Sequence, residues 1–503
     1  MNALSADTQI AVIGAGTMGA GIAQVAAHAG HDVLLYDAAS GAAEKGIANV
    51  GEGLFRQVER GKLTTEQVSN ILSRMIPVAR LEDLSPAGLV IEAIIEDLQI
   101  KQDLFKSLED ICGDQTILAS NTSSLSITAI GSALSRPQNF VGLHFFNPAQ
   151  VMKLVEIISG SATTPDIAQT AFDTAQAWGK KPVHAASTPG FIVNRVARPF
   201  YAEALRVLEE GAADIATIDA IMKESAGFRM GPFELMDLIG NDVNLAVTKS
   251  VFKSYHYDPR FKPSLVQEDM VAAGKFGRKS GSGYYDYADG EPKTEAQTSP
   301  EMTFPETVSV RGDLGVATPL VTLIENAGIK VVRENSDISE GFFQVANAEI
   351  RLTNGSLATE RGNNTIYFDL ALDYEKASRI ALAASDQCEP SAIEQAIGLF
   401  QALGKSVSVI DDIPAMIVMR SVCMLANEGA DAVNQGVCNE EAVDTAMCFG
   451  VNYPEGPLQW ADRIGLKVVE NVLDQMVRVY GEPRYRCSPL IRRKALNGSN
   501  FRP

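Results

Sequence analysis

Two segments of this 503-residue chain recur at one fixed distance along the sequence. TPGFIVNR at Thr188–Arg195 is echoed by IPAMIVMR at Ile413–Arg420, and GPFELMDLIG at Gly231–Gly240 is echoed by GPLQWADRIG at Gly456–Gly465. Both pairs are 225 positions apart, and Gly179-Lys180 against Gly404-Lys405 keeps this spacing. Several matches at one gapless offset indicate a duplicated structural unit. The chain is therefore predicted to carry two copies of an α-helical module.

From the N-terminus to about Ala185, short β-branched runs alternate with amphipathic helices, which is typical of a parallel sheet covered by helices. The runs that predict strands are Ile10–Ile13, His31–Tyr36, Leu89–Ala93, Thr116–Ala119, Phe140–Leu143 and Leu154–Ile158. A capping box at Thr64 and Gln67 predicts a helix to about Met75. The later periodicity allows one long helix over Val193–Leu208.

The first strand is followed directly by GAGTMG, in which Gly14, Gly16 and Gly19 form the G-x-G-x-x-G pattern before a helix. In this pattern the first glycine allows a tight turn, the second lets the backbone approach a pyrophosphate, and the third lets the helix pack on the strand. Asp37 ends the next strand, where a carboxylate binds ribose hydroxyls and repels a 2′-phosphate. The sequence therefore predicts a Rossmann-type domain that binds NAD in preference to NADP.

These patterns together predict five parts. They are an NAD-binding Rossmann domain over 1–186, a first helical domain over 187–288, a linker over 289–311, a reduced Rossmann-like segment over 312–410 and a second helical domain over 411–503. The linker prediction follows from a polar stretch rich in Pro, Glu and Thr. The fold class is thus an α/β Rossmann-type domain followed by an all-α domain, with a second, degenerate α/β-plus-α copy that lacks the glycine-rich start.

Composition excludes several function classes. Lys and Arg number 43 against 62 Asp and Glu, and the net charge of −19 would repel a phosphate backbone, so we expect no nucleic-acid partner. The six cysteines form no CxxC pair, so we expect neither a metal site nor disulfides. The N-terminus lacks the features of a signal peptide, and the apolar stretch from Ile10 to Gly30 is rich in glycine. We expect a cytoplasmic protein without membrane contact.

Oxidation of a secondary alcohol needs a group that takes the hydroxyl proton as the hydride leaves, and histidine suits this role near neutral pH. Of the five histidines, His144 in LHFFNP is the one that ends a strand where such folds bind ligands. SNTSS at Ser120–Ser124 offers hydroxyls at the same edge. Glu156 is expected on the return strand, where its carboxylate could hold the second imidazole nitrogen. These residues favour a dehydrogenase site.

The sequence as a whole resembles the 3-hydroxyacyl-CoA dehydrogenase family. The similar motifs follow in order over about residues 8–287 and are GAGTMGAGIAQ, IEAIIEDLQIKQDLF, SNTSSLSIT, GLHFFNPAQVMKLVEII, TPGFIVNR and GRKSGSGYYDY. The resemblance implies NAD-dependent oxidation of a (3S)-3-hydroxyacyl-CoA thioester, with His144 as general base and Glu156 as its partner. It implies that Ser123 and Asn194 hold the substrate hydroxyl and thioester region. The residues that it places near the cofactor are Glu96, Lys101, Asn147 and Lys279.

One departure from the family concerns coenzyme A. On the helix after Asp37, where family members often carry Ser and Lys facing CoA, this chain has Gly53 and Arg60. Arg60 can still engage a phosphate. The alternative is that Arg56, Arg60 and Lys62 form an ordinary solvated face, and the sequence leaves both interpretations open.

The acyl group and the metabolic role also stay open. Two-copy members of the family resemble bacterial enzymes that oxidise 3-hydroxyadipyl-CoA in phenylacetate breakdown, or 3-hydroxybutyryl-CoA in fatty-acid or butanoate metabolism. A dehydrogenase for a free 3-hydroxy acid or sugar acid would need a cationic clamp for the carboxylate, and none is compelling here. A non-catalytic structural relative that retains NAD binding is the alternative of a different class.

The second copy is expected to be structural. The offset of the repeat places Met419 opposite Asn194, Ala381 opposite Glu156, Asp369 opposite His144 and Ala348 opposite Ser123. No glycine fingerprint precedes this half, so we expect one NAD site per chain. In one-copy relatives the helical module pairs two subunits across a two-fold axis. We therefore expect the helical domains to pair within one chain as a pseudo-dimer, with further homo-oligomerisation left open.

Overall fold

The computed structural model describes residues 3–288, 294–334 and 340–502. The chain forms two compact units, and each is described by itself. The first unit comprises Met1–Arg195 with Gln435–Val451, and the second comprises Val196–Asn434 with Asn452–Pro503. Residues 289–293 of the expected linker lie outside the described residues.

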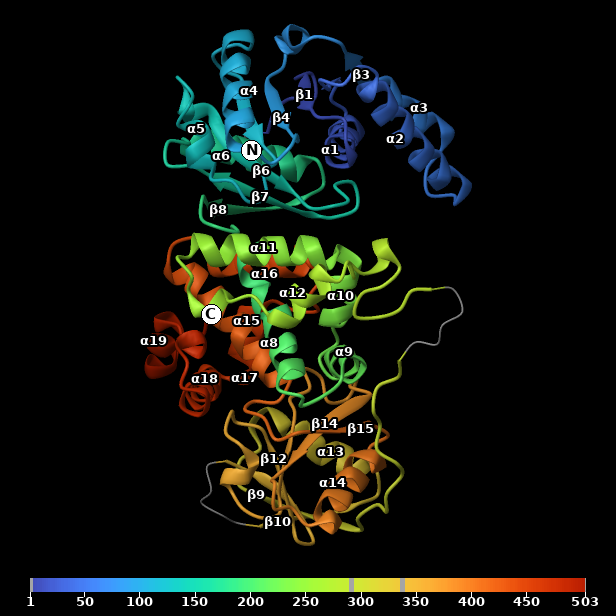
Figure 1. Cartoon of the computed structure of the whole chain (residues 1–503), viewed down its shortest axis with the longest axis vertical. Coiled ribbons are helices and arrows are strands. Elements are labelled where there is room, and N and C mark those ends of the chain that lie inside the picture. Colours follow the sequence, from blue (N-terminus) through green and yellow to red (C-terminus); the bar gives the residue numbers. More distant parts are fainter. Residues whose placement is uncertain (1–2, 289–293, 335–339, 503) are drawn as a thin grey trace. The chain divides into compact units, whose positions relative to one another are not determined.

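The first unit is a sheet covered by helices (Figure 1). Its strands are β1 (Ile10–Ile13), β2 (Val33–Tyr36), β3 (Met75–Val78), β4 (Leu89–Glu92), β5 (Ile117–Ser120), β6 (Phe140–Phe145), β7 (Leu154–Ser159) and β8 (Lys181–Ala186). Its helices are α1 (Thr17–His28), α2 (Ala42–Glu59), α3 (Thr65–Ser73), α4 (Leu98–Ile111), α5 (Ile127–Gly131), α6 (Pro165–Ala177) and α16 (Glu440–Gly450), and α7 (Val193–Val196) begins at its end.

The strand order of this sheet is that of a dinucleotide-binding fold. The strands follow as β3-β2-β1-β4-β5-β6-β7-β8, and the first six reproduce the order 3-2-1-4-5-6. Neighbouring strands are parallel except for β6 and β7, which are antiparallel. The expected Rossmann-type fold is confirmed. The carboxyl ends of β1, β2, β4, β5 and β6 therefore meet at one edge, where the candidate site is found.

The second unit contains a smaller sheet and most of the helices of both copies. Its strands are β9 (Thr307–Arg311), β10 (Lys330–Glu334), β11 (Phe342–Val345), β12 (Ala348–Leu352), β13 (Thr365–Phe368), β14 (Arg379–Ala384) and β15 (Ser406–Ile410), in the order β10-β9-β11-β12-β13-β14-β15. Two helices accompany this sheet, α13 (Pro319–Asn326) and α14 (Pro390–Ala402). The remaining helices are α8 (Arg198–Glu209), α9 (Ile215–Glu224), α10 (Pro232–Ile239), α11 (Asn241–Ser254), α12 (Leu265–Ala272), α15 (Val418–Asn434), α17 (Pro457–Ile464), α18 (Leu466–Tyr480) and α19 (Pro489–Asn497).

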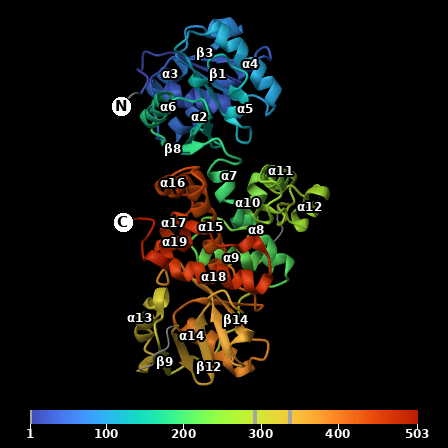
Figure 2. The same cartoon turned by 90° about the vertical axis from the view of Figure 1, so that its left-hand side faces the viewer.

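Within this second unit, α15 of the second copy lies between α17 and α8 (Figure 2). Its residues from Val418 to Ala432 are all buried, so the helix is surrounded on all sides. A helix buried all round belongs to the centre of a packed bundle. The helices of the two copies therefore share one core.

The structure confirms the predicted duplication. Three pairs of elements have first and last residues that differ by the same 225 positions as the repeated segments. These pairs are β7 and β14, α6 and α14, and α10 and α17. The repeated lysine has the same function in both copies. Lys180 Nζ donates to the carbonyl oxygens of Ala149 (2.5 Å) and Met152 (2.8 Å), and Lys405 Nζ donates to those of Tyr374 and Ala377, both at 2.7 Å.

The structure differs from the sequence-based prediction at four places. β3 begins at Met75, where the predicted helix was expected to end, and β8 was not predicted. The expected long helix from Val193 is interrupted at Ala197, because Pro199 lacks the N–H that would continue it. Met424 takes the place of Pro199 in the second copy, and α15 runs unbroken. The second sheet begins with β9, inside the stretch expected as a linker.

A membrane-crossing helix needs both length and apolar character. No helix within residues 3–288, 294–334 and 340–502 combines the two to that degree.

Candidate active site

The glycine loop after β1 is shaped by close contacts. Gly14 has φ +96°, and a Cβ there would lie 2.5 Å from the Ala93 carbonyl oxygen. A Cβ at Gly19 would lie 1.7 Å from the carbonyl oxygen of Gly14, because helix α1 starts tight against the turn. Gly16, in contrast, faces open space, with nothing within 4 Å of an added Cβ. The loop thus has the tight turn, close packing and open approach that a pyrophosphate at the start of α1 requires.

Asp37 follows β2 and reaches back to this loop. Its Oδ2 accepts a hydrogen bond from the Ala15 N–H (2.7 Å) and its Oδ1 accepts one from the Ala39 N–H (2.9 Å). Each carboxylate oxygen has a further lone pair, so both can also accept from ribose hydroxyls. The residues present therefore fit the adenosine half of NAD, with a fixed negative charge beside the ribose position.

His144 and Glu156 form a buried pair on β6 and β7. The antiparallel register sets the two residues directly opposite each other, and His144 Nδ1 lies 2.6 Å from Glu156 Oε2. The histidine is 6% exposed and the glutamate 0%. Glu156 Oε1 also accepts hydrogen bonds from the N–H groups of Ile192 and Val193, both at 3.0 Å, at the start of α7. The carboxylate is thereby fixed, and it orients the imidazole.

Ser123 and Asn194 meet near the same edge. Asn194 Nδ2 donates to the Ser123 carbonyl oxygen (3.4 Å), which links the start of α7 to the loop after β5. The rings of Phe146 and Phe191 lie 4.5 and 5.8 Å from the imidazole of His144, measured between ring centroids. The imidazole is therefore flanked by two aromatic rings.

A buried ionic network supports the loop that carries Ser123. Lys101 Nζ lies 2.6 Å from Glu92 Oε1 and 3.2 Å from Glu96 Oε2. Glu96 Oε1 accepts hydrogen bonds from the Thr122 hydroxyl (2.6 Å) and from the N–H groups of Ser123 and Ser124. Partial burial works to raise the pKa of Glu96, but hydrogen bonds from Thr122 and Ser124 and the charge of Lys101 outweigh it and hold the pKa below its usual range. Glu96 is thus ionised near neutral pH and anchors the loop.

Sequence reasoning missed Glu92, which is the centre of this network. Its Oε2 accepts from the Ser120 hydroxyl (2.7 Å) and its Oε1 from the Ile94 N–H (2.7 Å) and Lys101. Glu92 is 0% exposed. The signal that could have found it is an acidic residue that closes an otherwise apolar strand at the ligand edge of the sheet.

Asn147, Gly53 and Arg60 belong to the first unit, and Lys279 belongs to the second. Asn147 is exposed just after β6, and Arg60 is exposed at the carboxyl end of α2. Gly53, on the same helix, leaves open space where a side chain would stand. Lys279 belongs to the other unit, where its Nζ lies 2.6 Å from Asp242 Oδ1. In the described part of the chain, no group of three or more His, Cys, Asp and Glu side chains is placed to hold a metal.

The corresponding place in the second copy carries different residues. Asp369 stands where His144 does, and its N–H donates to the carbonyl oxygen of Ala381 (3.0 Å), which stands where Glu156 does. The Asp369 carboxylate accepts hydrogen bonds from the N–H groups at the start of α15, namely Ile417 (2.9 Å), Val418 (2.7 Å) and Met419 (3.0 Å). The second copy therefore keeps a carboxylate at the helix start, and the imidazole is gone.

The expected pairing of Ala348 with Ser123 is wrong. Ser120 is opposite Gly142 in β5 and β6, and Arg351 is opposite Tyr367 in β12 and β13. Gly142 and Tyr367 correspond at the offset of the repeat, so Arg351 takes the place of Ser120. The counterpart of Ser123 falls in the loop after β12, because the connection between these two strands is shorter in the second copy.

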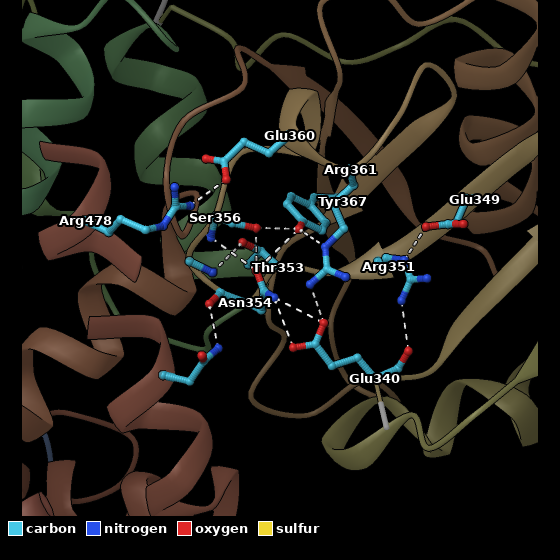
Figure 3. Close-up of polar contacts among 12 residues, drawn as sticks. Glu340, Glu349, Arg351, Thr353, Asn354, Ser356, Glu360, Arg361, Tyr367 and Arg478 are labelled. Carbon is cyan, nitrogen blue, oxygen red and sulfur yellow. Dashed lines mark hydrogen bonds and ion pairs between the residues drawn. The ribbon is translucent and has the colours of Figure 1, made fainter. Parts of the chain in front are cut away.

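Polar side chains at this loop bind one another (Figure 3). The Tyr367 hydroxyl lies 2.8 Å from Ser356 Oγ and accepts from Arg361 Nε (3.0 Å). Arg361 also pairs with Glu340, which accepts from Asn354 Nδ2 (3.2 Å). These groups satisfy each other's hydrogen bonds and charges, so we interpret their contacts as a network that stabilises the loop.

Known proteins resemble this chain over its whole length. Residues 9–188 match the family described as 3-hydroxyacyl-CoA dehydrogenase, NAD binding domain; residues 190–287 and 416–502 match the 3-hydroxyacyl-CoA dehydrogenase, C-terminal domain; and residues 350–414 match the 3-hydroxybutyryl-CoA dehydrogenase reduced Rossmann-fold domain. The 3-hydroxyadipyl-CoA dehydrogenase of Escherichia coli (strain K12) is 43% identical over 494 residues, 98% of each chain.

Two further relatives are 3-hydroxybutyryl-CoA dehydrogenases. A crystal structure of the enzyme from Escherichia coli K12 has a TM-score of 0.89 and 41% sequence identity, and the match covers 98% of this chain and 99% of that one. The enzyme of Clostridioides difficile is 43% identical over 279 residues, which are 56% of this chain and 99% of that relative.

Proposed function

Because the chain belongs to the 3-hydroxyacyl-CoA dehydrogenase family, an NAD-dependent group of oxidoreductases, we propose that His144 is the general base in the oxidation of the 3-hydroxyl of a 3-hydroxyacyl-CoA. The observation that carries this proposal is the buried 2.6 Å hydrogen bond between His144 Nδ1 and Glu156 Oε2, at the ligand edge of the sheet. The product is the 3-oxoacyl-CoA.

The arrangement of the pair determines the path of the proton. Glu156 holds the proton on Nδ1, so the lone pair of Nε2 is left for the substrate hydroxyl. His144 takes the hydroxyl proton at Nε2 while the C3–H bond breaks and the C3=O bond forms. NAD bound at the glycine loop supplies the acceptor for the hydride of C3. The charge of Glu156 stabilises the imidazolium, and the N–H groups of Ile192 and Val193 keep this carboxylate in place.

The other site residues receive supporting roles in this proposal. Ser123 and Asn194 hold the substrate hydroxyl and the thioester region, and the link between them supports a shared function. Glu96 and Lys101 act near the cofactor by fixing the loop after β5, as the network around Glu92 suggests. Asn147 completes the cofactor contacts, and Arg60 contacts CoA through a phosphate. The expected cytoplasmic location stays a prediction.

For the acyl group we propose a dicarboxylic chain, as in 3-hydroxyadipyl-CoA. Support comes from the relative with that name, which matches 98% of the chain. The second candidate is 3-hydroxybutyryl-CoA, which is favoured by the names of the two other relatives. The two acyl groups differ by one methylene, which is worth only about 1–3 kcal/mol in a pocket, and by a terminal carboxylate, so the side chains that face this carboxylate decide between them.

A panel of acyl-CoA substrates tests both levels of the proposal. NADH formation is followed with 3-hydroxybutyryl-CoA, 3-hydroxyhexanoyl-CoA and 3-hydroxyadipyl-CoA, and the substrates are ranked by kcat/KM. We expect turnover of all three and the highest kcat/KM for 3-hydroxyadipyl-CoA. A higher value for 3-hydroxybutyryl-CoA would favour the second candidate. No turnover of any CoA thioester would refute the proposed reaction.

The two helical modules are proposed to form an intramolecular pseudo-dimer. Contacts between them come in reciprocal pairs, as an interface with two-fold symmetry requires. Arg260 of the first copy binds Glu428 of the second (3.1 Å), and Arg484 of the second copy binds Glu203 of the first (3.0 Å). Glu203 and Glu428 correspond at the offset of the repeat, and the two arginines occupy matching turns, PRF and PRY.

A backbone pair extends this reciprocity from the helices to the sheets. The Ala186 N–H donates to the Val437 carbonyl oxygen (2.8 Å), and the Asp411 N–H donates to that of Ala212 (3.1 Å). Both partners of one bond correspond, at the offset of the repeat, to the partners of the other. The helix after Val437, α16, therefore packs on the sheet of the first copy. In the same way, the helix after Ala212, α9, packs on the sheet of the second copy. This exchange supports pairing within one chain.

A further inference from the structure

We infer that α16, which the second copy contributes to the first unit, is a positioning element for the His144–Glu156 pair, and that its last residue, Gly450, is the point of contact. The inference rests on the proposed role of His144. It gives the second copy a part in the chemistry of the first, although that copy lacks the histidine.

The sheet face that carries Glu156 is the one that α16 covers. Successive residues of a strand point to opposite faces. Val155 and Ile157 of β7 belong to the core that includes the alanines of α6. Leu154 and Glu156 therefore point to the opposite face. On that face α16 contacts both β7 and β8. The segment that leads into α16 is held to β8 by the hydrogen bond from the Ala186 N–H to the Val437 carbonyl oxygen.

Gly450 touches the two segments that hold Glu156. A Cβ at this position would lie 2.6 Å from Leu154 Cδ2 and 3.1 Å from Val193 Cγ2. Leu154 precedes Glu156 by two positions on the same face of β7. Val193 supplies one of the two N–H groups that bind Glu156 Oε1. Leu154 is 0% exposed and Val193 3%, so neither has free space into which to move. A glycine is therefore needed for α16 to approach this closely.

Cys438, two residues before α16, is also close to the carboxylate. Burial, and next to it the negative charge of Glu156, raise the pKa of the Cys438 thiol to about 12. Cys438 is consequently uncharged near neutral pH and adds no second negative charge beside Glu156. By covering this face, α16 keeps water from the carboxylate, which then gives its full charge and its hydrogen bond to His144.

Substitution of Gly450 in the full-length chain tests the inference. In Gly450→Val the added side chain must displace Leu154 or Val193 and so move Glu156. We expect kcat to fall about 10- to 100-fold, the scale of a misplaced catalytic group. The pH profile of kcat/KM should change, while the dissociation constant of NAD stays within about twofold of the wild type. Glu441→Val adds the same side chain at an exposed position of α16 and should keep the wild-type kcat.

A second substitution separates positioning from general damage. Leu154→Ala removes the atom nearest to the added group, so Gly450→Val combined with Leu154→Ala should regain part of the kcat that Gly450→Val loses. Gly450→Ala repeats the test with one methyl group if the valine variant does not fold. A folded Gly450 variant with wild-type kcat and pH profile overturns the inference, as does an equal loss in Glu441→Val. Absence of wild-type turnover would instead refute the proposed function.

Discussion

Asp37 connects the second strand to the glycine loop and fixes a negative charge beside it. Both carboxylate oxygens are oriented by backbone N–H groups, those of Ala15 and Ala39. We propose that this charge lies beside the ribose of the cofactor, where it cannot turn away from a phosphate on that ribose. NAD leaves two hydroxyls there as hydrogen-bond donors, whereas NADP places a further negative group in the same space.

Asp37→Ala should narrow the preference for NAD over NADP. The change removes repulsion of the 2′-phosphate and also removes hydrogen bonds to a charged group, which are worth about 1.5–3 kcal/mol. We expect kcat/KM for NAD to fall roughly 10- to 100-fold and kcat/KM for NADP to fall less or to rise. Asp32→Ala, at an exposed aspartate just before β2, is the control. A wild-type enzyme that prefers NADP would contradict the placement of Asp37.

Glu156→Gln should slow catalysis without loss of NAD affinity. The amide can still accept a hydrogen bond, but it has no charge to stabilise the imidazolium, and its NH₂ group disturbs the contacts at Ile192 and Val193. We expect a smaller loss of kcat than for removal of His144, together with a changed pH profile. Asp369→Asn makes the same kind of change in the second copy and should leave kcat unaltered. An unchanged profile in Glu156→Gln would count against the pair.

Part of the site could be predicted from the sequence, for a physical reason. His144 and Glu156 lie on consecutive antiparallel strands, so their contact depends on a short stretch of chain that the sequence reveals. Glu92 escaped prediction because its partners, Lys101 and Ser120, come from two other segments. A buried ionic cluster of this kind is defined only when three segments meet.

At the scale of elements, the repeat was the most reliable guide. It identified the segment that forms α17, and in the structure the same offset relates β7 to β14 and α6 to α14, because duplicated segments pack in the same way. β3 and β8 were missed since both contain proline, at Pro77 and Pro182, which weakens a strand signal. Both lie at the outer ends of the sheet order, where a proline is tolerated because one side of the strand needs no N–H donor.

Lys180 illustrates how an element is fastened in both copies. The sequence shows only that a lysine recurs after a glycine. In the structure, its ammonium fastens the chain between β6 and β7 through the carbonyl oxygens of Ala149 and Met152. Burial lowers the pKa of Lys180 to about 8, against 10.5 for an ordinary lysine. Between these pH values the unfolded chain binds a proton that the folded chain has released, so Lys180 makes stability rise with pH in that window.

Lys180→Met should therefore change the pH dependence of stability. We expect a loss of about 1–3 kcal/mol of unfolding free energy at pH 7.5, because two buried carbonyl groups lose their donor. Between about pH 8 and 10.5 the unfolding free energy of the variant should also rise less with pH than that of the wild type, because the contribution of Lys180 is missing. Urea unfolding at pH 7.5 and 9.5 measures both effects. Lys181→Met, at the exposed neighbouring residue, is the control. Parallel pH dependence in wild type and Lys180→Met would refute this explanation.

At the scale of the whole molecule, we expect one chain to carry a single active site. The second copy has Asp369 in place of the histidine. In the turn after β9, Gly341 packs against Asp313, and a Cβ added at Gly341 would lie 2.5 Å from the Asp313 backbone. Calorimetric titration should therefore give one NAD per chain.

A chain truncated near residue 290 loses α16 and α15 and should aggregate or self-associate in light scattering. Two NAD per chain, or a well-behaved truncated monomer, would contradict the proposed pseudo-dimer.

All turnover of the chain is proposed to pass through His144, and NADH formation by the full-length His144→Gln variant tests this most directly. Glutamine fills similar space but cannot act as a base near neutral pH. We predict that kcat falls roughly 10²–10⁴-fold, the usual scale for a lost general base, while NAD binds as in the wild type. A fall of only about twofold would reveal a second active site in the chain, and wild-type turnover would remove His144 from the mechanism.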